Sequence, residues 1–312
     1  MSKYYLGIDT SNYTTSVCAY NHDENTVINK RRLLPVKAGD RGLRQSDAVF
    51  HHTQQLPALF DELYAEKSYD FSAVGVSSRP RSMEGSYMPC FTVGMGAAKI
   101  ISKSNKIELY EFSHQQGHIA AALYSSNRLD LIDMPHIAFH VSGGTTEALL
   151  VNSGKGFLST KLLAKTLDLN AGQLIDRVGV MLGLQFPCGK ELEKLALNCT
   201  DKINVKPVLK DFDCCLSGGE NLCQNLLKNG KSKEYIAKFC LKYVEAAIFN
   251  MSEKITDKYP KLPIVYAGGV MSNSIIKNSI YDNFDCVFAK PEFSTDNAAG
   301  VAVLAYYRDN CF

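Results

Sequence analysis

Two histidines at helical spacing have the chemistry of a metal site. His114 and His118 are separated by one helical turn in the segment SHQQGHIAAALY, so on a helix both imidazoles lie on one face. Ser113 and Gln116 predict an N-cap and the third position of a capping box, which places the start of that helix at the histidines. Such a pair can chelate a divalent metal ion and leave positions for a carboxylate and for substrate.

Asp296 is a candidate for that carboxylate. It lies in the segment STDN, at the expected start of the last helix, where an aspartate is more typical of a helix cap. Two ordinary histidines on a helix are likewise the simpler interpretation of the pair, and the residue after His114 is not the Glu of the HExxH metallopeptidase motif. If the three side chains meet, two histidines and one aspartate form an open site suited to iron(II) or zinc, which can polarise oxygen ligands of a substrate.

Two turns of small residues suggest a nucleotide site. The segments SGGTT at 142–146 and GGV at 268–270 leave backbone N–H groups accessible, and such turns at strand ends or helix starts suit phosphates. Neither segment is a Walker A motif or a dinucleotide fingerprint. Taken singly, each is equally well explained as a tight turn.

The surrounding elements indicate an α/β chain. A strand, a small polar turn and a second strand occur at residues 4–20 and again at 137–151, which is a faint internal repeat. Strands are also expected at 71–78, 262–267 and 286–290. Helical patterns cover 54–66, 94–102, 170–183, 233–255 and 295–307, and strands that alternate with helices favour this class.

Composition excludes several classes of protein. The 312 residues carry 34 basic and 32 acidic side chains, a net charge of +2, which argues against a polybasic or acidic disordered chain. A chain of this size can bury about three quarters of its unfolded surface as one large domain or two lobes.

We find no apolar run of about 20 residues and no signal-peptide pattern, so we expect no membrane contact and a cytoplasmic location. The ten scattered cysteines, without a CxxC motif, are expected to be reduced core thiols.

Six segments, taken in order, resemble one family, the threonylcarbamoyl-adenosine tRNA modification enzymes, or TsaD-like proteins, formerly called O-sialoglycoprotein endopeptidases. The resemblance covers nearly the whole chain in collinear order, which is more specific than any single motif. The segments are GIDTS at 7–11, HQQGH at 114–118, VSGGTTEALLV at 141–151, LDLNAGQLIDRVGVMLGLQFPCG at 167–189, YAGGVMSN at 266–273 and STDNAAGVAVLAY at 294–306.

The resemblance implies an α/β fold of the actin-like ATPase (ASKHA) type, in which two related lobes enclose a nucleotide and a metal ion. Each hairpin would begin one lobe: residues 1–135, with 295–312 packing back on them, and residues 136–294. It also implies that His114, His118 and Asp296 bind one divalent ion, iron or zinc. The residues implied to line a pocket for ATP or an acyl-adenylate are Ser142, Gly143, Gly144, Thr145, Asp176, Gly189 and Asn273. Among these, Asp176 would hold ribose hydroxyls, Gly189 would allow close backbone approach, and Asn273 would lie beside the adenosine.

The implied activity is that of an acyltransferase. Threonylcarbamoyl would pass from threonylcarbamoyl-AMP to the exocyclic amine of an adenosine next to the anticodon of tRNA. The implied partners are tRNA, the adenylate, a paralogous partner subunit and a small ATPase. For tRNA, the basic residues within 30–44 and the pair Arg79 and Arg81 offer local positive surface, with a solvated face as the alternative. No catalytic base is assigned.

The sequence also departs from the family pattern. Asn12, Tyr13 and Thr14 replace a Cys-Asp-Glu run, which removes two carboxylates suited to proton handling. The other altered positions are Arg79-Pro80-Arg81 for Gly-Pro-Gly, Gln116 and Gln173 for Glu, Thr145 for His, Cys188 for Gly, and LSGGE at 216–220 for FSGLK. The pattern indicates a divergent paralogue. The alternatives are a metal- and nucleotide-dependent carbamoyltransferase with another acceptor, and a non-catalytic nucleotide-binding partner subunit.

Overall fold

The computed structural model describes residues 2–11, 13–35, 43–154 and 157–310, and the chain divides into two compact units. Unit 1 comprises Met1–Met134, Asn152–Ser159 and Glu292–Phe312, and unit 2 comprises Pro135–Val151 and Thr160–Pro291. None of the described helices combines the length and apolar character that a bilayer-spanning helix needs.

A five-stranded sheet forms the centre of unit 1. The predicted first hairpin is confirmed, because β1 and β2 pair antiparallel, while β4 runs parallel to both β1 and β5. The strands, in sheet order, are β3 (Thr26–Leu33), β2 (Thr14–Asn21), β1 (Lys3–Ser11), β4 (Asp70–Arg79) and β5 (Glu108–Ser113). We did not predict β3, whose cations we interpreted only as a basic stretch. It pairs with β2 at the sheet edge, where charged side chains are common.

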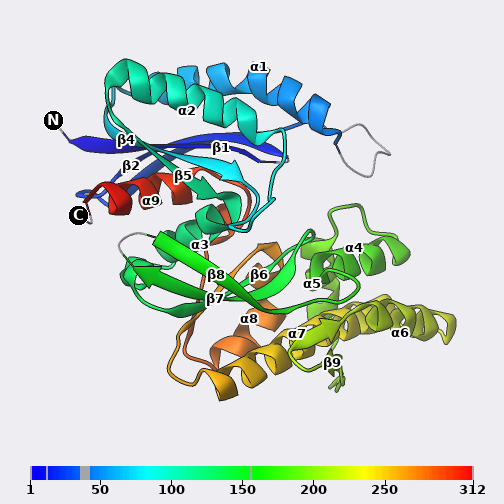
Figure 1. Cartoon of the computed structure of the whole chain (residues 1–312). Coiled ribbons are helices and arrows are strands. Elements are labelled where there is room, and N and C mark those ends of the chain that lie inside the picture. The colour runs from blue at the N-terminus through cyan, green and yellow to red at the C-terminus, as the bar shows by residue number, and fades with distance from the viewer. Residues whose placement is uncertain (1, 12, 36–42, 155–156, 311–312) are drawn as a thin grey trace. The chain divides into compact units, whose positions relative to one another are not determined.

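Helices cover both faces of this sheet (Figure 1). One face is covered by α1 (Gln45–Tyr64) and α2 (Phe91–Asn105), and the other by α9 (Ala299–Asn310). On its outer side α9 packs against α3 (His114–Ser125). Because β1 is covered on both faces, it is buried almost throughout, and Leu6 and Ile8 belong to the core.

The sheet of unit 2 has the same order of strand types. Its second predicted hairpin is confirmed, because β6 and β7 pair antiparallel, while β11 runs parallel to both β6 and β12. The strands, in sheet order, are β12 (Cys286–Phe288), β11 (Ile264–Ala267), β6 (His136–Val141), β7 (Thr146–Gly154) and β8 (Phe157–Lys165). Each sheet thus joins an antiparallel hairpin to a parallel side. This duplication is the repeat that the two hairpins indicated.

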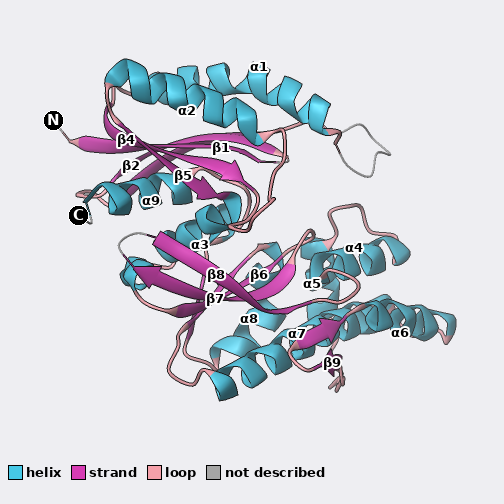
Figure 2. Ribbon diagram, viewed as in Figure 1, coloured by secondary structure: helices cyan, strands magenta, loops and turns pink. Residues whose placement is uncertain are grey.

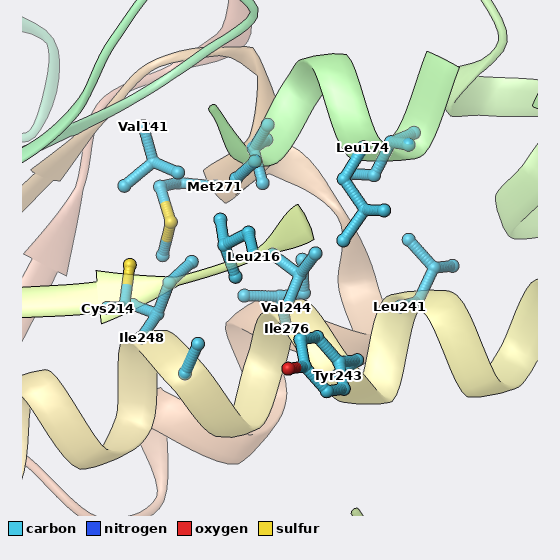
Figure 3. Close-up of a cluster of buried hydrophobic side chains, with 14 of the residues drawn as sticks. Val141, Leu174, Cys214, Leu216, Leu241, Tyr243, Val244, Ile248, Met271 and Ile276 are labelled. Atoms are coloured by element: carbon cyan, nitrogen blue, oxygen red, sulfur yellow. The ribbon is translucent and has the colours of Figure 1, made fainter. Parts of the chain in front are cut away.

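Five of the nine described α-helices, α4 to α8, lie in unit 2 (Figure 2). The longest of them is α7 (Lys233–Lys258), which confirms the helix predicted over 233–255. Its apolar stripe is core: Tyr243, Val244 and Ile248 pack toward Leu174 and Met271 (Figure 3). The remaining elements are α4 (Ala171–Met181), α5 (Gly189–Leu197), β9 (Val208–Lys210), β10 (Asp213–Cys215), α6 (Ser217–Lys228), α7 (Lys233–Lys258), η2 (Gly269–Ser272) and α8 (Ser274–Tyr281). Two further short helices, η1 (Leu129–Asp133) and η3 (Pro291–Phe293), complete the described elements.

The first turn of α9 packs unusually closely against its neighbours. A Cβ atom built on Gly300 would lie 1.8 Å from the carbonyl oxygen of Gly117 on α3, and one on Gly7 of β1 would lie 2.3 Å from the carbonyl oxygen of Ala298. No side chain fits at these two crossings. The small residues of this segment therefore fix the start of α9 against both α3 and the sheet.

We expect Gly300→Ala to destabilise the chain by about 3 kcal/mol, at the upper end of the cost of overpacking. The matched control is Gly96→Ala on α2, where an added Cβ meets nothing within 4 Å, so the gain in helix propensity should stabilise the chain by about 0.5–1 kcal/mol. Urea unfolding of both variants measures the difference. Equal stabilities would contradict the close crossing.

Candidate functional site

The start of α3 places the two histidines. The Ser113 hydroxyl accepts from the Gln116 backbone N–H at 3.2 Å, and the Gln116 side-chain oxygen accepts from the Ser113 N–H at 2.7 Å. This is the predicted capping box, which satisfies two backbone donors that a helix start leaves unpaired. His114 is consequently the first residue of α3, and His118 lies one turn further along the same face.

Asp296 joins these histidines in unit 1. Its Oδ1 lies 3.4 Å from His114 Nε2 and 3.2 Å from His118 Nε2, and the two Nε2 atoms are 2.9 Å apart. Asp296 does not cap the last helix, which was the alternative interpretation. α9 begins at Ala299, and the Asn297 side chain accepts from the Ala299 N–H at 3.1 Å. The structure thus brings the three predicted residues together.

The spacing of these atoms suits one ion. Two ligand atoms that each lie about 2.1 Å from a tetrahedral ion are about 3.4 Å apart, which is close to the separations in this cluster. Within the described ranges of the chain, it is the only group of three or more His, Cys, Asp or Glu residues with ligand atoms all within 4.8 Å of one another. The donor set of two imidazoles and one carboxylate fits iron(II) or zinc and leaves coordination positions open.

Asp9, at the end of β1, is a functional residue that sequence reasoning missed. Its side chain is only 1% exposed, and its Oδ2 accepts from His114 Nδ1–H at 2.8 Å and from the Ser77 hydroxyl. Its Oδ1 accepts from the Ser11 N–H at 2.8 Å. A carboxylate behind an imidazole fixes the ring and its tautomer, so Asp9 turns His114 Nε2 toward the cluster. The available signal was an aspartate directly after the apolar residues Leu6 and Ile8 of a buried strand.

Charges in the cluster perturb one another. Burial lowers the pKa of His114, but the Asp9 charge and the hydrogen bonds to Asp296 and Asp9 outweigh this effect and raise the pKa to about 10. Burial raises the pKa of Asp296, but hydrogen bonds and charges from His114 and His118 hold that pKa well below its usual range. The pKa of Asp9 is lowered in the same way, against the effect of its burial. Both carboxylates are therefore ionised and able to act as acceptors at neutral pH.

The turn that follows β6 lies in unit 2, and its backbone is internally bonded. The Ser142 hydroxyl accepts from the Gly144 N–H at 3.3 Å and from the Thr145 N–H at 3.1 Å. The Ser142 carbonyl accepts from the N–H of Gly172, in the first turn of α4, at 3.1 Å. This turn is therefore formed and held against a helix start, with its small residues at the carboxyl end of the strand.

The second small-residue turn meets the same strand end. Gly268 has φ +101°, and a Cβ on it would lie 2.2 Å from the Val141 carbonyl oxygen, so only glycine fits there. The turn leads to Asn273, whose side-chain oxygen caps α8 by accepting from the N–H groups of Ile275 and Ile276 at 3.1 and 3.3 Å. Figure 3 shows Val141, Met271 and Leu174 packing into the core beneath.

Asp176 and Gly189 are linked through α5. The Asp176 side chain accepts from the N–H of Cys188 at 2.8 Å, and Gly189 is the first residue of that helix. Burial raises the pKa of Asp176, and the hydrogen bond from Cys188 partly opposes this rise. Glu193 on α5, which was not predicted, accepts from the Ser274 N–H at 2.7 Å. Contacts thus run from the 142–145 turn through α4 and α5 to the start of α8, so unit 2 brings its predicted residues to neighbouring elements.

A cavity of about 530 Å³ lies between α4 and α6 in unit 2. Of the predicted residues only Asp176 lines it. Arg177 on α4 and Glu220 on α6 form an ion pair at 3.0 Å, and Glu220 belongs to the altered LSGGE segment. The full lining is Gln173, Asp176, Arg177, Val180, Met181, Phe186, Glu220 and Gln224.

Four of the cations expected to attract tRNA have partners within unit 1. Lys30 pairs with Glu66, and Arg32 pairs with Glu62. Between them, Arg31 donates to the segment that precedes Asp296. Arg79 donates to the Ser78 hydroxyl at 2.9 Å. Of the other positions singled out in the sequence, Asn12, Lys37 and Arg41 lie outside the described residues.

The strand order of the two sheets defines the class of protein: the chain has the actin-like ATPase (ASKHA) fold, as predicted. Two solved structures show the same fold. Full-length HypF, in a phosphate- and nucleotide-bound form, has a TM-score of 0.59 at 12% identity over 98% of this chain. A ROK family glucokinase from Streptomyces griseus has a TM-score of 0.53 at 9% identity, with 97% of this chain and 99% of the glucokinase covered. The chain spans 46% of the length of HypF.

Sequence comparison places the chain within this class. The family described as TsaD, tRNA N6-adenosine threonylcarbamoyltransferase, matches residues 35–303, and the chain belongs to this family. A tRNA N6-adenosine threonylcarbamoyltransferase of Streptococcus agalactiae serotype III (strain NEM316) is 28% identical over 97% of this chain and 92% of its own length. One from Halalkalibacterium halodurans is 27% identical over 82% of this chain and 76% of its own length.

Two of the altered positions occupy the same place in two capping boxes. Gln116 is 2% exposed, and its side-chain N–H donates to the Leu158 carbonyl at 2.5 Å. Gln173 is exposed, and its side-chain oxygen accepts from the Asn170 N–H at 3.2 Å. Glutamate can replace the acceptor in either box, but an ionised glutamate cannot donate to Leu158.

We expect Gln116→Glu to destabilise the chain by roughly 1–3 kcal/mol at pH 7, because it sets a buried carboxylate against a carbonyl oxygen. Gln173→Glu is the matched control. It keeps its cap and adds a negative charge at a helix N-terminus, so its stability should be unchanged or slightly higher. Urea unfolding measures the stability of both variants. If Gln116→Glu is as stable as the wild type, the hydrogen bond to Leu158 contributes nothing to stability.

Proposed function

We propose that the chain transfers threonylcarbamoyl from threonylcarbamoyl-AMP to N6 of an adenosine next to the anticodon of tRNA. The observation that carries the proposal is the cluster of His114, His118 and Asp296, backed by the buried Asp9, in a member of the TsaD family. A cluster with open coordination positions suits a substrate that presents carbonyl and hydroxyl oxygens.

In this proposal, His114, His118 and Asp296 hold one divalent ion, iron or zinc. When bound, the ion supplies Lewis acidity toward oxygen ligands of the threonylcarbamoyl group. Asp9 keeps the His114 ring in the orientation that presents Nε2, because its Oδ2 accepts a hydrogen bond from His114 Nδ1–H at 2.8 Å. His118 and Asp296 complete the set from α3 and from the segment before α9.

We further propose that unit 2 binds the adenylate. Ser142, Gly143, Gly144 and Thr145 would face its phosphate with turn N–H groups, because such groups stabilise the negative charge of a leaving AMP. Phosphate would compete there with the Ser142 hydroxyl, which accepts from two of these groups. Asp176 would accept from ribose hydroxyls, Gly189 would allow close approach, and Asn273 would lie beside the adenosine.

Proton handling differs from the family pattern, since neither Tyr13 nor Thr14 offers a carboxylate at the first hairpin. Attack of the N6 amine on the threonylcarbamoyl carbonyl forms the new C–N bond, breaks the bond to AMP and releases the amine proton. The paralogous partner subunit and the small ATPase stay predictions from the resemblance, and the cytoplasmic location stays a prediction from the sequence patterns. Both proteins can be added to or left out of an assay.

The proposed metal ligands can be tested by measuring the metal content of the purified chain. We expect the purified chain, loaded with Zn²⁺ or Fe²⁺ and desalted, to retain about one ion per chain. His118→Ala and Asp296→Ala should lose most of it, because each removes a ligand. Asp9→Asn should weaken affinity about 10–100-fold. Elemental mass spectrometry measures the content, and His51→Ala on α1 is the control. Unchanged metal in both ligand variants would exclude the assignment.

Reconstitution tests the reaction itself. The metal-loaded chain should convert tRNA adenosine to the threonylcarbamoyl nucleoside when incubated with threonine, bicarbonate, ATP, an adenylate-forming enzyme and tRNA. Nucleoside mass spectrometry detects the product, and the Asp296→Ala chain should form none. The assay runs with and without a paralogous subunit and a small ATPase from a TsaD system. If metal binds and no arm yields modified adenosine, the proposed acceptor is wrong, and carbamoyl transfer to another acceptor takes its place.

A further inference from the structure

The ligand Asp296 lies on a loop, whereas both histidines lie on a helix. The loop comprises residues 294–298, between η3 and α9, and belongs to unit 1. A helix fixes its side chains through its backbone, but a loop residue keeps its place only if other contacts hold it. The contacts around Asp296 therefore decide whether its carboxylate stays with the histidines.

Two of these contacts are internal to the loop or come from α3. The Asn297 side-chain N–H donates to the carbonyl oxygens of Thr295 at 2.7 Å and Phe293 at 3.3 Å, so it closes the loop on itself. The Phe293 ring packs on Tyr124 of α3, with 5.4 Å between the ring centroids. The loop is thus attached to the same helix that supplies the histidines.

The third contact comes from the sheet edge. Nη1 of Arg31, on β3, donates to the Glu292 carbonyl at 3.0 Å and to the Thr295 hydroxyl at 2.5 Å. One nitrogen thus bridges both ends of the segment that precedes Asp296. Successive strand residues point to opposite faces, and the neighbours Lys30 and Arg32 instead pair with Glu66 and Glu62, beside the helix layer of α1.

We propose that Arg31 is a positioning residue of the metal site: by holding the 292–295 segment, it keeps Asp296 Oδ1 within 3.4 Å of both histidine Nε2 atoms. The inference rests on the proposed metal set. It gives Arg31 a role other than the tRNA contact that the basic stretch first suggested. Residues behind a metal ligand typically change affinity about 10–100-fold when removed, and Arg31 acts on the ligand through Thr295 and the loop backbone.

Arg31→Ala and Arg32→Ala form a matched pair, because they remove the same charge from adjacent positions of one strand. We expect Arg31→Ala to weaken Zn²⁺ affinity at least about tenfold and to speed Zn²⁺ release, while Arg32→Ala keeps the wild-type values. Competition with a chromogenic chelator measures affinity, and stopped-flow transfer to excess chelator measures release. Both use the full chain without tRNA. Arg31→Lys, which retains a donor, should recover part of the affinity.

Thr295→Val provides a second route that leaves Arg31 in place. It removes the hydroxyl acceptor and should weaken affinity in the same direction, and the double variant should lose less than the sum of the two single variants, because both break one contact. This arm carries the test if Arg31→Ala does not fold.

The outcomes separate the two proposals. Wild-type affinity in Arg31→Ala, or equal losses in Arg31→Ala and Arg32→Ala, would overturn the positioning role and leave the metal set intact. Additive losses in the double variant would also overturn it. A wild-type chain that binds no Zn²⁺ and no Fe²⁺ would overturn the metal set, and the role of Arg31 with it.

Discussion

The close approach of α9 to α3 and β1 is the constraint on which the cluster of His114, His118 and Asp296 depends. Its residues come from distant parts of the chain, and they meet only because the first turn of α9 touches Gly117 and Gly7 without intervening side chains. Two backbones at this distance cannot shift independently. The loop before α9 therefore begins from a fixed point, and Asp296 needs only short-range contacts to reach the histidines of α3.

A buried charge completes this arrangement. Asp9 is almost inaccessible to solvent, and a carboxylate in such a place is costly unless its oxygens are fully bonded. Ser11, Ser77 and His114 supply those bonds from β1, β4 and the start of α3. The same bonds that make the buried charge tolerable also orient the imidazole, so the strand ends of the sheet and the histidine cluster form one hydrogen-bonded structure.

Local patterns explain which features could be predicted from sequence. The capping box at Ser113, both hairpins and the helical pattern of α7 depend on residues that are close in sequence, and the structure contains them all. Strand β3 was missed because its cations belong to an edge with solvent on one side. Asp9 was missed because its role depends on a histidine far along the chain, and the Arg31 contact is equally non-local.

The residues that depart from the family pattern each depend on a separate local contact, unlike the residues of the cluster. Cys188 replaces a glycine and packs where Gly179 carries no side chain, since a Cβ there would lie 2.2 Å from the Cys188 Cβ. Glu220 replaces a lysine and faces the cavity, where Arg177 neutralises it. Gln116 gains a buried donor for Leu158. Each change has its own local partner, whereas the cluster needs all of its members at once, because removing one ligand leaves the others unable to hold an ion. Divergence is therefore easier at these positions than at the histidines and Asp296.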